Sequence, residues 1–228
     1  MPIVRPSLGV APLAAALIAL AVPAGAQNAN PLAGATRAPQ AAATTDSFGG
    51  LIIPAPERGQ LRPDPDNAAT GGVVFADELG WYRFMMPDGG TTALEGEMRQ
   101  FSFPAGTIPT TCFAIKVKEA SLAKFPITQI QAELDTLYPK FDSAITGAGF
   151  AIEHRESLVL DSAGQRSAVP LKLLAWDSRS DNGIRATWTL MPSQIGYLLF
   201  ACMGADPGHQ REVIQRYLRI GSVMTSGK

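Results

Sequence analysis

The spacing of hydrophobic residues changes twice along this chain, and each change predicts a different kind of element. Between residues 71 and 117, apolar residues occur in short runs with glycine- and proline-containing turns among them, which is typical of β-strands. From Ile127 to Ile145 they recur at steps of three and four, which predicts an amphipathic helix that breaks near Pro139. Alternation then returns in three further strand-like runs, at 151–160, 167–176 and 184–190.

The last part of the chain predicts a buried strand followed by a helix. Tyr197–Met203 has no polar face, so we expect a central strand that is covered on both sides. Asp206 suits a helix N-cap, Pro207 suits the first helical position, and Gly221 suits the end of the helix. Together these elements predict an α+β domain, an antiparallel sheet meander with two helices packed on it.

Three segments of this pattern carry a family resemblance. They are the run Gly80–Pro87 (GWYRFMMP), the strand Phe113–Val117 before the Ile127–Leu137 helix, and the closing strand Tyr197–Met203 with the helix after it. In this order they resemble the PsbP-like superfamily, over roughly Gly71 to Met224, and the resemblance implies an αβα sandwich. Because that superfamily is functionally diverse, the resemblance implies no activity and no binding or metal residue.

The first 26 residues have the features of a Sec-type signal peptide. Arg5 gives a positive start, the run Ala11–Val22 is apolar, and Ala24-Gly25-Ala26 matches the small-residue cleavage pattern. The apolar run is shorter than the roughly 20 residues that span a bilayer, so an uncleaved anchor is the weaker interpretation. We therefore expect a periplasmic or secreted protein with no stable membrane anchor after cleavage.

Residues 27–70 are rich in Ala, Pro, Asn, Gly and Thr, which predicts a disordered tether before a single domain at 71–228. The apolar island Gly50–Pro54 interrupts this segment. One interpretation is a short motif that adds to a sheet edge of a partner. The other, which we favour, is that the island packs back onto its own domain.

Charge disfavours two classes of partner. The chain has 19 basic and 20 acidic side chains, a formal charge of −1. Such a balance argues against a nucleic-acid partner and against attraction to an anionic membrane surface, because both need clustered Lys and Arg.

The two cysteines, Cys112 and Cys202, both lie in apolar, strand-like segments. In an oxidising compartment this minimal even count predicts one disulfide. The alternative is a pair of buried thiols that pack as small hydrophobes.

Candidate chemistry is sparse. His154 and Glu156 share a face of one predicted strand and offer two ligands to a metal, although alternating charges on an exposed strand explain them as well. His209 falls in the first turn of the last helix, where a solvated or capping role is expected. Trp81 and Tyr82 point to opposite faces of their strand, so we expect at least one of them to face the surface or to be covered by a helix, and that residue is a candidate surface binding contact. The common catalytic, metal and nucleotide motifs are missing from the sequence, and no cofactor is predicted.

These observations favour an exported, non-catalytic envelope protein that acts as a binding or assembly module for another envelope protein. The alternative is a hydrolase or metal-dependent periplasmic enzyme with a site near His154 and Glu156. A chaperone-like role is a third hypothesis, which would require a large exposed apolar patch.

Overall fold

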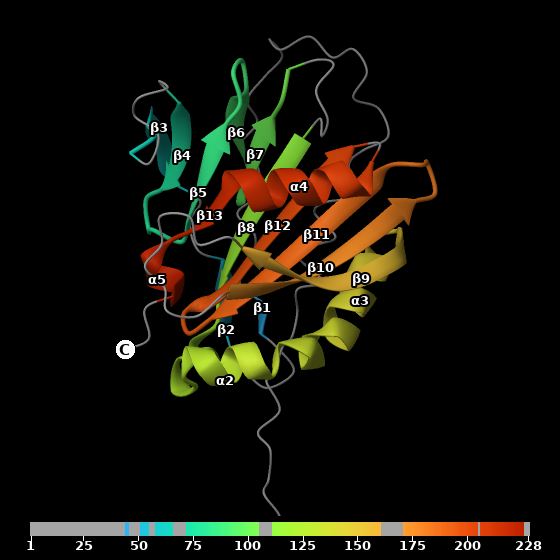
Figure 1. Cartoon of the computed structure of the whole chain (residues 1–228). Coiled ribbons are helices and arrows are strands. Elements are labelled where there is room, and N and C mark those ends of the chain that lie inside the picture. Colours follow the sequence, from blue (N-terminus) through green and yellow to red (C-terminus); the bar gives the residue numbers. More distant parts are fainter. Residues whose placement is uncertain are drawn as a thin grey trace, which may run out of the picture.

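Two antiparallel sheets and the helices packed on them make up the protein (Figure 1). The computed structural model describes residues 44–45, 51–54, 58–65, 72–104, 111–160, 171–204 and 206–225. Helices lie on both faces of the larger sheet, which confirms the predicted α+β class. The predicted signal peptide, residues 1–26, lies outside the described residues.

The larger sheet has nine strands, and its main path runs β1-β2-β8-β12-β11-β10-β9. Strands β9 to β12 form the predicted meander, and β12 then pairs with β8 in the middle of the sheet. Every residue of β12 except the last is buried, as the absence of a polar face predicted. The bounds are β1 Thr44–Thr45, β2 Leu51–Pro54, β6 Thr91–Glu95, β7 Met98–Ser102, β8 Thr111–Lys118, β9 Phe150–Leu160, β10 Leu171–Ser180, β11 Arg185–Ser193 and β12 Gly196–Gly204.

A second, four-stranded sheet was not predicted. Its order is β13-β5-β4-β3, and its strands are β3 Gly59–Pro63, β4 Val73–Asp77, β5 Tyr82–Met86 and β13 Leu218–Ile220. Alternation identifies a strand but carries no information about which sheet the strand joins, so the sequence suggested a single sheet.

The helices divide between the two faces of the larger sheet (Figure 1). One face carries the predicted Ile127–Ile145 helix, which is broken before Pro139 because proline fits only the first turn of a new helix. The other face carries the last helix, capped by Asp206, whose Oδ1 accepts a hydrogen bond from Gly208 N at 2.9 Å. The bounds are η2 Ala120–Lys124, α2 Ile127–Ala132, η3 Leu134–Leu137, α3 Tyr138–Gly147, α4 Pro207–Tyr217 and α5 Ser222–Thr225.

Helix α4 is shorter than the helix predicted for the end of the chain. It ends at Tyr217 rather than near Gly221, because the next three residues extend and pair with β5 as β13. Apolar residues at 218 and 220 fit both a helical stripe and an alternating strand. They form a strand here because the free edge of β5 is available for pairing.

Each face of the larger sheet has its own apolar core. The first core joins α2, η3 and α3 to residues such as Trp176 and Trp188. The second core joins α4 and the smaller sheet to the opposite face, where the Phe84 ring lies 4.5 Å from the Phe101 ring and 5.2 Å from the Phe200 ring. The helix–sheet–helix layering of the predicted αβα sandwich is therefore present, with the smaller sheet as an addition.

Trp81 and Tyr82 are both buried in this second core, with 2% and 0% of their surfaces exposed. The prediction that one of them is a surface binding contact is wrong. The smaller sheet packs one of its faces on the larger sheet, and Trp81 precedes β5 in a turn, so strict alternation does not apply to it.

The predicted disulfide is present. Cys112 on β8 and Cys202 on β12 are direct partners in the register, with Cα atoms 4.0 Å apart, and both are fully buried. The bond therefore joins two neighbouring central strands rather than distant surface loops.

The start of the folded region lies earlier than Gly71. Within the predicted tether 27–70, β3 pairs with β4 over five residues, and β2 pairs with the end of β8. The polar, proline-rich composition of this stretch hid β3 because edge strands tolerate such residues. The pairing of β2 agrees with the interpretation that the island Gly50–Pro54 packs on its own domain.

None of the helices in the described part of the chain is both long enough and apolar enough to cross a membrane.

Candidate functional site

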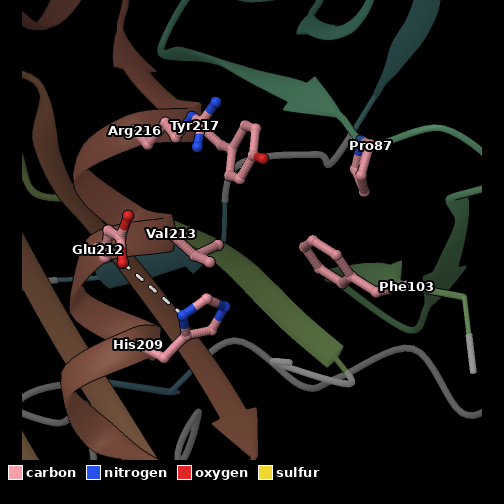
Figure 2. Close-up of a pocket in the computed structure, with 7 residues that line it drawn as sticks. All are labelled: Pro87, Phe103, His209, Glu212, Val213, Arg216 and Tyr217. Carbon is pink, nitrogen blue, oxygen red and sulfur yellow. Dashed lines mark ion pairs between the residues drawn. The ribbon is translucent and has the colours of Figure 1, made fainter. Parts of the chain in front are cut away.

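A pocket of about 290 Å³ opens beside α4 (Figure 2). One wall is a single face of the helix, because its residues are three or four positions apart. The opposite wall comes from the ends of two strands, Pro87 after β5 and Phe103 after β7. The lining residues are Pro87, Phe103, His209, Glu212, Val213, Arg216 and Tyr217.

The second core holds the apolar walls of this pocket in place. Phe84 lies behind both aromatic residues, with ring centroids 6.2 Å from Phe103 and 6.2 Å from Tyr217. Val213 lies between them on α4 and is buried. Since these side chains are packed against the core, the pocket is formed without a ligand.

The mouth of the pocket is polar and carries both signs of charge. His209 Nδ1 lies 3.7 Å from Glu212 Oε2, and these side chains are 42% and 66% exposed. The Arg216 guanidinium lies 5.5 Å from the ring centroid of Tyr217. Within the described residues, Arg216 makes no ion pair, so its charge is open to a ligand.

His154 and Glu156, the predicted metal ligands, lie on edge strand β9, on the face of the sheet that carries α4. Glu156 forms an ion pair with Arg211 of α4, and Arg211 also lies 3.2 Å from Asp177 Oδ2. Asp177 Oδ1 in turn accepts a hydrogen bond from Thr187 at 2.8 Å. His154 is exposed, opposite Asp177 in the register.

This charged group ties α4 to the larger sheet. Burial works against the charge of Arg211, but the hydrogen bond with Glu156 and the charges of Asp177 and Glu156 outweigh it and raise the Arg211 pKa. Over the residues that the structure describes, no three His, Cys, Asp or Glu side chains gather where they would hold a metal ion. Glu156 therefore acts in an ion pair with Arg211, and this role explains the residue without a metal.

The sequence analysis did not identify the pocket. The spacing of the last helix places Val213 and Tyr217 on its apolar stripe and Arg216 on its polar face, but nothing in the sequence places Phe103 beside them. The sequence does give one indication of a binding surface. Arg216 and Tyr217 are adjacent at the boundary between the polar and apolar faces of the helix. The partner wall depends on tertiary packing alone.

No protein-family model and no curated protein matches the chain. Among solved structures, the chain is similar to the solution structure of cyanobacterial PsbP (CyanoP) from Synechocystis sp. PCC 6803, with a TM-score of 0.45 and 10% sequence identity. The similarity covers 64% of this chain and 91% of that one, and it is a diffuse resemblance at the level of the fold.

Proposed function

We propose that this protein is an exported binding or assembly module that contacts another envelope protein through the α4 pocket. The observation that carries the proposal is the combination of rigid apolar walls with an unpaired cation, Arg216, at the mouth of the pocket in the described part of the chain. Ligand sites typically pair an apolar concave surface with a few polar groups that fix orientation.

Export rests on two features. The signal-peptide pattern of residues 1–26 predicts secretion. The buried disulfide between Cys112 and Cys202 suits an oxidising compartment, where such bonds persist. We therefore place the protein in the periplasm or outside the cell.

The structure adds no support to a metal-dependent enzyme near His154. A metal at Glu156 would have to displace Arg211, which is held by two carboxylates. Breaking that pairing would leave a partly buried guanidinium without its main partner.

Site-specific photo-crosslinking in living cells tests the proposal. A photoreactive amino acid at Asp88, an exposed residue next to Pro87 of the pocket wall, should give a discrete cross-linked product with an envelope protein. The matched control carries the same group at Asp135, an exposed residue of η3 on the opposite side of the larger sheet. The same products from both positions, or none from Asp88, would contradict a pocket-centred binding function.

A further inference from the structure

We propose that the α4 pocket holds the C-terminal residue of a polypeptide, with its apolar side chain on the aromatic walls and its terminal carboxylate on Arg216. This inference rests on the proposed function and specifies what part of the partner is recognised.

The anion is assigned from Arg216. A guanidinium presents several N–H donors in a plane and pairs with a carboxylate through two parallel hydrogen bonds. Other arginines near α4 are engaged, since Arg211 pairs with Glu156 and Asp177, and Arg219 donates to the backbone carbonyls of Gln215 and Leu218. In the described part of the chain, Arg216 makes no hydrogen bond or ion pair, and its guanidinium lies over the Tyr217 ring.

The apolar part is assigned from size and lining. The pocket volume of about 290 Å³ is enough for one large side chain. Phe103, Val213 and Tyr217 offer the apolar contacts, and an aromatic or branched side chain would remove most of that surface from water.

The polypeptide source is assigned from Glu212. A simple carboxylic acid has no N–H group that could donate a hydrogen bond to this negatively charged side chain. The last residue of a peptide also carries an amide N–H, which can donate to the Glu212 carboxylate one helical turn away from Arg216. Because Glu212 is 66% exposed, the rest of the peptide can leave the pocket toward solvent.

Figure 2 shows the geometry that this mode requires. His209, Glu212 and Val213 lie along one side, the Phe103 ring faces them across the pocket, and Tyr217 and Arg216 lie at the next turn of α4. In this mode a side chain enters between Phe103 and Val213, and its carboxylate points toward Tyr217 and Arg216, which line the same pocket.

The test is a calorimetric titration of the full oxidised chain with the acetylated tetrapeptide Gly-Gly-Leu-Phe, as its free C-terminal acid and as its C-terminal amide. We expect the acid to bind with a Kd of about 0.1–1 mM, and the amide to bind about tenfold more weakly. Arg216→Gln should weaken the acid about tenfold and leave the amide unchanged, since a hydrogen bond to a charged group is lost. The control Arg62→Gln removes an exposed positive charge from β3, which lies far from α4 in the sequence, and should change the affinity for neither the acid nor the amide.

Three results would overturn the inference. They are equal binding of acid and amide, undiminished binding to the Arg216→Gln variant, and binding of 4-phenylbutyrate as tight as that of the peptide, which would identify a site for small carboxylic acids. If cross-linking from position 88 still yields a partner in any of these cases, the proposed binding function stands and only the C-terminal mode fails.

Discussion

At the scale of single residues, the ion pair between Lys116 and Asp77 is the most consequential polar contact in the core. Lys116 lies on β8 of the larger sheet and Asp77 ends β4 of the smaller one, and neither side chain is exposed. Asp77 Oδ2 also accepts a hydrogen bond from Trp81 N at 3.0 Å. The pair therefore links the two sheets through groups that would be costly to bury separately.

Lys116→Met should lower the free energy of unfolding by about 3–5 kcal/mol, because it leaves the Asp77 carboxylate buried without its cation. The double variant Lys116→Met/Asp77→Asn should lose less, since the asparagine side chain is neutral and its oxygen can still accept the hydrogen bond from Trp81 N. Urea unfolding of both variants measures the difference. A double variant less stable than the single one would show that the pair does not act as a charge-neutralising unit.

Tyr197 of β12 contrasts with this ion pair, because its buried hydroxyl has no partner group among the described residues. Its side chain is 1% exposed, and among the described residues its hydroxyl has no hydrogen-bond partner. Burial raises the pKa of Tyr197, and the charge of Glu119 raises it further. Because the folded state holds this proton more tightly than the unfolded state, the stability of the fold is unaffected by the shift below the unfolded pKa of about 10 and falls as the pH rises above it.

Tyr197→Phe should therefore raise the free energy of unfolding by about 1 kcal/mol at pH 7, because an unsatisfied hydroxyl is removed. It should also flatten the loss of stability above pH 10, where the wild-type hydroxyl has to stay protonated. Thermal unfolding between pH 7 and pH 11 gives both quantities. A destabilised variant with an unchanged alkaline slope would show that the hydroxyl is satisfied.

At the scale of elements, the contact between Gly221 and Gly80 fixes how the end of the chain returns to the smaller sheet. Gly221 N donates to Trp81 O at 2.7 Å, directly after β13 pairs with β5. A Cβ atom at position 221 would lie 1.8 Å from Gly80 O. Only glycine allows the two backbones to approach this closely.

Gly221→Ala should cost about 2–3 kcal/mol of unfolding free energy, because the backbones must separate and β13 loosens from β5. Gly147→Ala is the matched control, since a Cβ atom there meets nothing within 4 Å at the end of α3. The control should be neutral or slightly stabilising. Hydrogen exchange at Leu218–Ile220 would locate the effect, and unchanged protection there in Gly221→Ala would contradict it.

Helices and strands with a clear hydrophobic pattern were predictable from the sequence, but the elements that they pack against were not. The all-apolar run of β12 and the helix break before Pro139 follow from residue type alone. The assignment of β4 and β5 to a second sheet does not, because an alternating strand fits either sheet equally well. The pocket escaped prediction for the same reason, since Phe103 and Val213 are brought together only by the packing of α4 on Phe84 and its neighbours.

At the scale of the molecule, the position of β3 sets the true start of the folded unit. Gly59 packs directly over Phe75, and Asp64 N donates to Gly72 O at 2.9 Å. The smaller sheet therefore needs residues that the composition assigned to a tether.

A chain that starts at Gly71 should be less stable than one that starts at Arg58 by about 1–3 kcal/mol, because Phe75 loses its cover and β4 becomes an edge. Guanidinium unfolding of the two chains gives the comparison. Equal midpoints would return the boundary to Gly71 and make β3 dispensable.

The position of the disulfide has a mechanical consequence. All members of the first core except Met203 lie between Cys112 and Cys202, which are 90 residues apart, whereas the second core also draws on residues before and after them. When an oxidised chain is pulled from its two ends, the tension passes from Cys112 to Cys202 through the sulfur bridge and bypasses the loop between them. The loop between the two cysteines, with a contour length of about 300 Å, therefore does not add to the length of the stretched chain. Stretching then unravels the smaller sheet and α4, while the helical layer on the other face carries no load.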